Sequence, residues 1–188
     1  MPGGVTVKLP RRQRREQLLA QATKVFADKG YASTGLEDVA AAAGVSRMIL
    51  YRHFESKADL YRAACERAGE RLAAATGDEL TESTVGALVR WAAKETAEFR
   101  LLFHQAAREA DFRADIDALR AELIETLRHR MRDLIPDRRW AKWAANLALT
   151  VTVEATMAWL EVGSPDPDQA ADRITETVQA VITAAIRH

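Results

Sequence analysis

Apolar residues recur along this chain with the three-to-four-residue spacing of amphipathic α-helices. The first such pattern predicts a helix over 11–29, and Gly30 occupies the position that commonly follows a helix end. The apolar face of this helix consists of Leu18, Ala22, Val25 and Phe26. Residues 1–10 show no such spacing and contain two prolines and two glycines, so we expect a flexible arm there.

Two short helices are predicted next. Thr34 and Glu37 have the spacing of a capping box, which predicts a second helix that ends at Gly44. Ser46 is a suitable N-cap for a third helix, because its hydroxyl group can accept from a free N–H group one turn on. The turn between these two helices is about three residues long and begins with glycine, which is typical of a helix-turn-helix motif.

The third helix has room for only about two turns, because Ser56 is an N-cap for the next helix and Asp59 completes an approximate capping box. A helix this short is not stable alone in water. Leu50 and Phe54 lie four residues apart and can anchor it to a core. A longer fourth helix is predicted from Ser56 to about residue 77.

The remaining apolar patterns predict helices over 83–99, 100–108, 112–135, 137–162 and 167–186. No strand-like alternation occurs. We therefore expect an all-α protein of about nine helices, with a helix-turn-helix domain over 11–56 and a helical bundle over 57–188. The fourth helix links the two parts.

Charge is distributed unevenly although the whole chain has a net charge of zero. Up to Arg62 there are eleven basic and six acidic residues, so the first third is positive and the remainder is equally negative. This asymmetry indicates that the N-terminal part meets a polyanion. Cys65 is the only cysteine, and neither a secretion signal nor a membrane-spanning run of apolar residues is present. We therefore expect a cytoplasmic protein with no disulfide, metal or cofactor.

The third helix has side chains suited to the DNA major groove, which admits one α-helix. Arg47 could donate two hydrogen bonds to a guanine, while Met48 and Ile49 could pack on thymine methyl groups. Arg52, one turn further on, could reach a base or a phosphate. These four residues are the predicted base-facing set.

Groups that can bind phosphate surround this helix. Four arginines precede the first apolar turn, helix-start N–H groups bind anions, and further donors follow the third helix. The predicted phosphate contacts are Arg11, Arg12, Arg14, Arg15, Thr34, Gly35, Ser46, Tyr51, His53 and Lys57.

Residues from about Gln17 to Tyr61, roughly a quarter of the chain, resemble the DNA-binding domain of the tetracycline-repressor (TetR) family. The resemblance rests on Ala22, Phe26, Gly30-Tyr31, Thr34, Val39-Ala40, Ala43-Gly-Val-Ser46, Leu50-Tyr51, His53-Phe54 and Ser56-Lys57-Ala-Asp-Leu60.

This resemblance implies a homodimeric, all-α repressor whose C-terminal domain binds a small molecule and so controls the affinity for a palindromic operator. By the family pattern, Tyr51, His53 and Lys57 match phosphate-contacting positions, while Arg47, Met48 and Arg52 match base-facing ones. The sequence departs from the pattern in two places. Gly35 replaces a hydroxyl residue, and Met48-Ile49 replaces a small residue followed by threonine, which favours thymine-directed recognition.

The C-terminal part carries many aromatic residues together with polar residues spaced by four on one helix. Apolar walls with a few convergent polar groups are typical of a ligand pocket. The predicted pocket consists of Trp91, Phe99, Phe103, Trp143, Asn146, Thr150, Glu154 and Met157. The alternative is that the aromatic residues form an ordinary core and that the polar residues are exposed.

Two helices carry faces that favour close helix packing, one of small and one of aliphatic residues. Two such helices from each of two chains would form a four-helix dimer interface. The predicted interface consists of Ala144, Ala148, Val151, Ala155, Ala158, Ile174, Val178, Val181 and Ala185. The alternative is that both faces belong to the core of a single chain.

Two other functions compete with a ligand-controlled repressor. An all-α enzyme would need catalytic groups near His104 or His129, but no metal-ligand spacing, nucleophile motif or phosphate-binding glycine loop is present. A DNA-binding dimer without an effector would share every N-terminal feature, so only the pocket distinguishes it.

Overall fold

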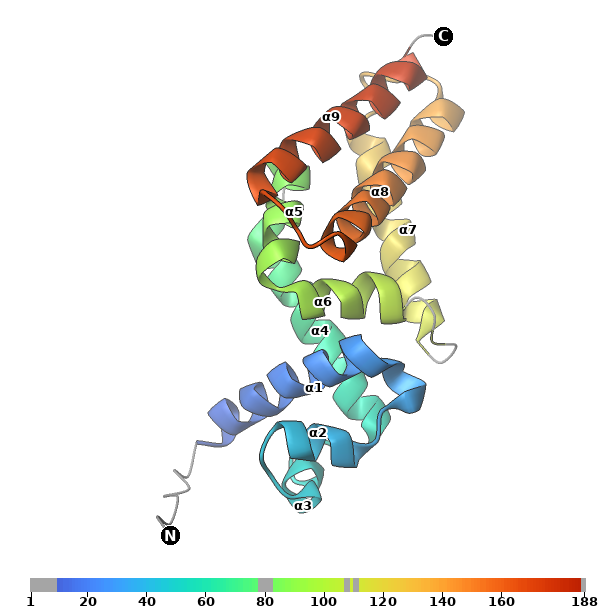
Figure 1. The fold of residues 1–188 in the computed structure, drawn as a ribbon. Helices are drawn as coiled ribbons and strands as arrows, with labels where there is room; N and C mark the ends of the chain where they lie inside the picture. The colour runs from blue at the N-terminus through green and yellow to red at the C-terminus, as the bar shows by residue number, and fades with distance from the viewer. Residues whose placement is uncertain (1–9, 78–82, 107–108, 110–111, 187–188) are drawn as a thin grey trace.

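The computed structural model describes residues 10–77, 83–106, 109 and 112–186, and these residues form nine α-helices and one π-helical turn. The predicted arm over 1–10 lies almost wholly outside the described residues, as does Arg108 at the end of one predicted helix. Figure 1 shows the N-terminal helices at one end of the molecule and the last two helices at the other. None of the described helices has the length and hydropathy needed to cross a bilayer.

The N-terminal domain is built from three helices packed on the first turns of a fourth. These helices are α1 (Arg11–Ser33), α2 (Leu36–Ala42), α3 (Arg47–Tyr51) and α4 (Lys57–Thr76). Their shared core contains fully buried large side chains such as Leu18, Phe26, Leu50 and Tyr61. The predicted all-α architecture with its helix-turn-helix is confirmed.

Glycines end two of these helices as the sequence predicts. Gly30 has φ 76°, so the helical part of α1 stops there and the chain bends before Tyr31. Gly44 has φ 65°, and the N–H of Val45 donates to the carbonyl of Ala40 at 3.0 Å, which closes the end of α2.

Two predicted helix caps differ in the structure. The N-cap of α2 is Gly35 rather than Thr34, and its N–H donates to Asp38 Oδ2 at 2.8 Å. The hydroxyl of Thr34 instead donates to the carbonyl of Gly30 at 2.7 Å, because the bend at Gly30 brings that carbonyl within reach. Ser46 precedes α3, but its side chain makes no capping hydrogen bond.

The C-terminal domain is an elongated bundle. It contains α5 (Ser83–Lys94), α6 (Thr96–Arg100), the π-helix η1 (Leu101–Gln105), α7 (Arg113–Arg130), α8 (Arg138–Glu161) and α9 (Pro167–Ile186). In place of the predicted helix over 83–99, the chain breaks at Glu95, because α5 packs on α9 whereas α6 packs on α1. One straight helix could not contact both. The predicted helix over 112–135 ends early at Arg130, after a basic last turn that suits a helix C-terminus.

Candidate DNA-binding surface

Helix α3 is held by its apolar side and presents its polar side to solvent. Leu50 and Phe54 are only 1% and 3% exposed, so they anchor the helix in the N-terminal core as predicted. Met48 is 66% exposed, and Arg47 and Arg52 are exposed as well. Ile49 instead packs partly against the core. Three of the four predicted base-facing residues are therefore exposed to solvent.

Arg47 is oriented by two neighbours before any ligand binds. Its guanidinium forms an ion pair with Glu37 of α2, a residue that the sequence predicts as part of a capping box and not as a partner of Arg47. It also donates to the hydroxyl of Tyr51 at 2.9 Å and lies 5.4 Å from the centre of that ring. The hydrogen bond to Tyr51, and then the charge of Glu37, raise the pKa of Arg47. Both partners are exposed, so the ion pair is weak enough to exchange for DNA.

The arginines at the start of α1 lie beside the end of α3. The pKa of His53 is lowered by burial and then by the charges of Arg11, Arg15 and Arg14, which places three guanidinium groups around the imidazole. Arg15 lies 5.0 Å from the centre of the Phe54 ring. The structure thus brings the predicted arginine cluster and His53 together in one positive surface, as part of helix α1 and not as a separate arm.

Other predicted phosphate contacts have partners within the chain. Lys57 Nζ donates to the carbonyls of Tyr31 and Thr34 at 2.9 and 3.1 Å and lies 4.2 Å from the centre of the Tyr31 ring. Thr34 is only 2% exposed. Together with Gly35, whose N–H is bonded to Asp38, these residues hold the corner between α1 and α2. Tyr51, Ser46 and Arg12 are exposed.

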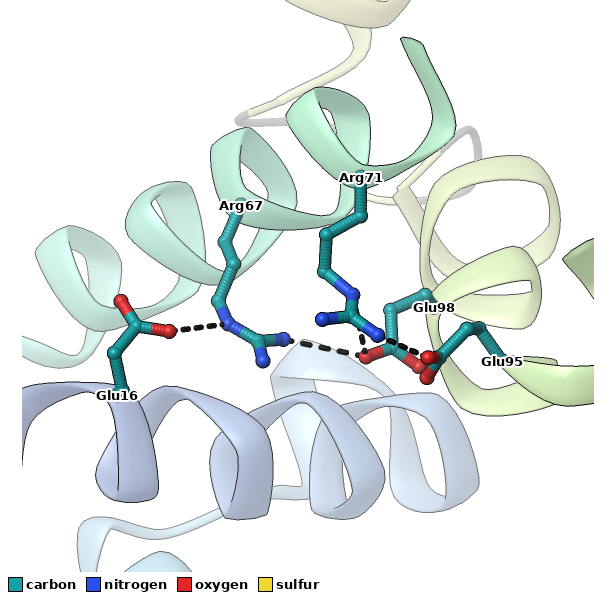
Figure 2. Close-up of polar contacts among 5 residues, drawn as sticks. All are labelled: Glu16, Arg67, Arg71, Glu95 and Glu98. Atoms are coloured by element: carbon teal, nitrogen blue, oxygen red, sulfur yellow. Dashed lines mark hydrogen bonds and ion pairs between the residues drawn. The ribbon is translucent and has the colours of Figure 1, made fainter. Parts of the chain in front are cut away.

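A network of charged residues joins this domain to the C-terminal bundle (Figure 2). Arg67 of α4 bonds Glu16 of α1 at 2.9 Å and Glu98 of α6 at 3.2 Å. One turn further along α4, Arg71 forms ion pairs with Glu95 and, at 3.8 Å, with Glu98. The Glu98 side chain is only 10% exposed and lies between the two arginines, which compensate its carboxylate in this buried place. The sequence patterns did not reveal this network, because its members are far apart along the chain.

A second connection joins η1, Glu109 and Phe112 to the bend of α1. Gln105 Nε2 donates to the carbonyl of Ala27 at 3.0 Å, and Glu109 Oε1 accepts from the N–H of Tyr31 at 3.0 Å. Phe112 packs on the rings of Tyr31 and Tyr61, with centroid distances of 5.1 and 4.5 Å. Residues of the C-terminal part therefore complete the core of the DNA-binding domain.

The predicted pocket residues are not gathered around one cavity. Trp91, Phe99 and Met157 belong to a packed core, with Phe103 against it. Trp143 is 41% exposed, and Glu154 is exposed on the surface of α8. Along the same helix, Asn146 donates to the carbonyl of Lys142, and Thr150 accepts from Arg120 at 2.8 Å.

A cavity of about 260 Å³ lies instead between the two domains. Met157 is the only predicted pocket residue that lines it. The other lining residues come from α1, α6, η1 and the end of α8, and they are Ala27, Asp28, Arg100, His104, Gln105 and Glu161. No sequence pattern pointed to this cavity, because it forms only where these four elements meet.

The predicted dimer residues divide into two groups. Five of the nine are buried in this chain's own core between α7, α8 and α9 or against α5, namely Ala144, Ala148, Ile174, Val178 and Ala185. Ala158 is exposed, and Val151, Ala155 and Val181 are half-buried. The exposed edge of α8 also includes Trp143 and, just beyond the helix, Val162 at 75% exposure.

The described residues offer no arrangement typical of a metal centre or a reactive thiol. No group of three or more histidine, cysteine or acidic side chains among them could hold a metal ion. Burial raises the pKa of the Cys65 thiol to about 12. The thiol is therefore protonated at neutral pH, and it packs between the cores of the two domains.

The short exposed helix α3, its preceding turn and the positive surface beside it define a helix-turn-helix protein of the DNA-binding class. Residues 18–64 match the family of bacterial regulatory proteins described as the tetR family. These residues form a TetR-family DNA-binding domain, which comprises most of α1, α2, α3 and the first turns of α4.

Similar proteins agree with this assignment. The chain is 43% identical over 77 residues to the HTH-type transcriptional activator FasR of Mycolicibacterium smegmatis, an alignment that covers 41% of this chain and 35% of that protein. The chain thus spans about a third of the length of this curated relative.

Solved structures resemble the whole chain. A TetR-like transcriptional regulator from Rhodococcus sp. RHA1 shares 25% identity with a TM-score of 0.79, covering 94% of this chain and 99% of that one. NalD of Pseudomonas aeruginosa, the secondary repressor of the MexAB-OprM multidrug efflux pump, shares the fold at 21% identity and a TM-score of 0.69, over 90% of this chain and 95% of that one. All three relatives are named as regulators of transcription and none as an enzyme.

Proposed function

We propose that this protein regulates transcription by binding a palindromic operator as a homodimer, and that it acts as a repressor. The observation that carries the proposal is the exposure of Arg47, Met48 and Arg52 on a helix anchored from behind by Leu50 and Phe54. Such a helix fits a major groove while the arginines at the start of α1 lie near the phosphates. The proposal includes a cytoplasmic location, where the protein has access to DNA.

Dimerisation follows from the weakness of a single α3, which offers too few contacts for specific binding on its own. Two copies about one DNA turn apart would read both halves of a palindrome. We place the interface on the outer faces of α8 and α9, where Val151, Ala155, Ala158 and Val181 remain accessible. Small side chains there allow two helices from each chain to approach closely.

Control by a small effector completes the proposal. The two domains share a core and a buried charge network, so a ligand that shifts one of them also changes the position of the other. The alternative is a DNA-binding dimer that responds to no effector.

The relatives include a protein named as an activator and one named as a repressor, so a measurement has to distinguish activation from repression.

The test is DNA binding by the full chain. Selection from a random duplex library, followed by gel shifts with the selected site and with DNA upstream of the protein's own gene, should yield a palindrome. The affinity for this site should fall steeply with salt, because phosphate contacts release counterions. Equal affinity for all duplexes would refute specific recognition. A reporter under the selected site then shows whether the protein represses.

A further inference from the structure

The cavity between the domains has an unusual arrangement of charge. Asp28 of α1 and Glu161 of α8 line it together with Arg100 of α6. Within the part of the chain that the structure describes, none of these three side chains has a hydrogen-bond or ion-pair partner. Asp28 and Glu161 are exposed and Arg100 is half-buried, so the cavity offers two carboxylates and one guanidinium that form no ion pair within the described residues.

Both carboxylates lie near the C-terminal ends of their helices, where a negative charge is unfavourable. Asp28 lies two residues before the bend at Gly30, and Glu161 is the last residue of α8. The C-terminal end of a helix carries a partial negative charge, so an acidic side chain there adds to the negative potential. Lys29, the nearest cation along α1, is turned to Asp38 at 2.7 Å. A cationic group between these two side chains would interact favourably with both carboxylates and with both helix ends.

The π-helix η1 contributes part of the cavity lining and is fixed next to Asp28. η1 supplies His104 and Gln105 to the cavity, and the hydrogen bond from Gln105 to the carbonyl of Ala27 fixes η1 on α1. π-Helical turns cost stability and frequently occur at functional sites. Ala27 and Met157, which are 5% and 9% exposed, are the apolar residues of the lining. The cavity thus combines two buried apolar residues with charged ones.

We propose that this cavity binds a small amino-acid-like zwitterion, with its ammonium group between Asp28 and Glu161 and its carboxylate on Arg100. The volume of about 260 Å³ is at the lower limit of small-molecule pockets, which fits a ligand of this size. Arginine is well suited to bind a carboxylate through two parallel hydrogen bonds.

This inference rests on the proposed function, because it identifies the class of effector. Asp28 belongs to the DNA-binding domain, whereas Arg100 and Glu161 belong to the C-terminal bundle. A ligand that contacts all three binds best in one relative arrangement of the domains. It therefore changes the population of that arrangement, and with it the operator affinity.

The test is calorimetric titration of the full chain with each of the twenty L-amino acids, together with thermal unfolding. At least one amino acid should bind and raise the melting temperature. Its N-acetyl derivative, which lacks the ammonium group, and the corresponding amine, which lacks the carboxylate, should each bind at least about tenfold more weakly. If no amino acid binds, or if either derivative binds equally well, the proposed ligand class is wrong.

Substitutions locate the binding. Glu161→Gln and Arg100→Gln should each lower the affinity at least about tenfold, whereas Glu154→Gln, an exposed residue on the same helix as Glu161, should leave it unchanged. Melting temperatures of the ligand-free variants verify that they fold. Unchanged binding in both Glu161→Gln and Arg100→Gln would place the ligand elsewhere and refute the site.

Operator binding by the same preparations separates the two proposals. If the protein binds an amino acid but shows no operator selectivity, the proposed binding site stands and the proposed function as a regulator is wrong. If the protein selects an operator but binds no amino acid, the proposed function as a regulator stands and the proposed binding site is wrong. An amino acid that binds but leaves operator affinity unchanged would refute its role as the effector.

Discussion

The side chain of Arg47 shows how a predicted base-contacting residue is oriented in the free protein. Glu37 and Tyr51 hold its guanidinium over the exposed side of α3, so fewer rotamers are left to fix when DNA binds. The sequence identified Arg47 and Tyr51 from their place in the short helix. It did not identify Glu37 as the partner of Arg47, because this pair forms only when α2 and α3 pack across the turn at Gly44.

Arg47→Ala should lower the affinity for the selected operator by roughly 5- to 100-fold and relax the preference at one base position in each half-site, because two hydrogen bonds to a base edge are lost. Measured affinities for operators substituted at single positions test this. Glu37→Gln is the matched control, since it frees Arg47 and should preserve the preference. An equal loss on every duplex would make Arg47 a phosphate contact.

His53 should link DNA binding to pH. Burial and three arginines lower the pKa of His53 in the free protein, and a bound phosphate would oppose the arginine charges and raise it. Binding then takes up a proton, so operator affinity should rise as pH falls from about 8 to 6, by at most about tenfold per pH unit for each His53.

Affinity measured across this pH range should lose that dependence in His53→Gln and keep it in His129→Gln, which alters an exposed residue of the remote helix α7. If the slope survives in His53→Gln, a different group takes up the proton. The folding stability of the DNA-free protein should depend on pH in the opposite direction from operator affinity. The unfolded state binds the proton more readily, so His53 makes the fold less stable as pH falls through its unfolded pKa near 6.5.

Among the elements, the N-terminal helices were the more predictable from sequence. Their ends are set by local signals such as Gly30, Gly44 and Ser56, and the side chain of Ser56 caps α4 by accepting from the N–H of Asp59 at 3.1 Å. The break at Glu95 and the π-helix have no comparable signal. They arise because α5 and α6 pack on different partners, which depends on contacts distant in sequence.

The predicted pocket shows the same limit for the candidate site. An aromatic side chain fills a core as readily as it lines a cavity, so the positions of Trp91 and Phe99 could not be decided by their spacing. Glu154 lies on the outside of α8, although it shares a helical face with Thr150 and Asn146. A periodic pattern identifies a face, but only the packed neighbours determine whether that face meets a cavity or solvent.

Glu98→Gln should destabilise the protein by about 1–3 kcal/mol, because it leaves Arg67 and Arg71 without their shared buried partner. Glu16→Gln is the matched control. It removes the other partner of Arg67, but the Glu16 side chain is 54% exposed, so the cost should be below about 1 kcal/mol. Urea unfolding measures both. Equal losses would show that burial of Glu98 does not strengthen its ion pairs.

On the scale of the whole molecule, the proposed two-fold assembly would determine whether α3 can bind an operator specifically. Ala158→Glu places a charge on the exposed edge of α8 and should yield a monomer whose operator affinity is reduced more than about tenfold, with the fold retained. Sedimentation and gel shifts measure these effects. Ala121→Glu, on the exposed side of α7, should remain dimeric. A dimer that persists in Ala158→Glu would place the interface elsewhere.

The core beneath α1 and α4 includes Leu101, Ala106 and Phe112, which come from beyond the linking helix. Cutting the chain after Thr76 would therefore expose the rings of Tyr31 and Tyr61 that Phe112 covers. The DNA-binding domain therefore cannot be transferred to another protein without the C-terminal residues that complete its core. A chimera that grafts it onto another regulator should fold well only if the recipient supplies an aromatic side chain at the place of Phe112 and a hydrogen-bonding partner for the bend of α1.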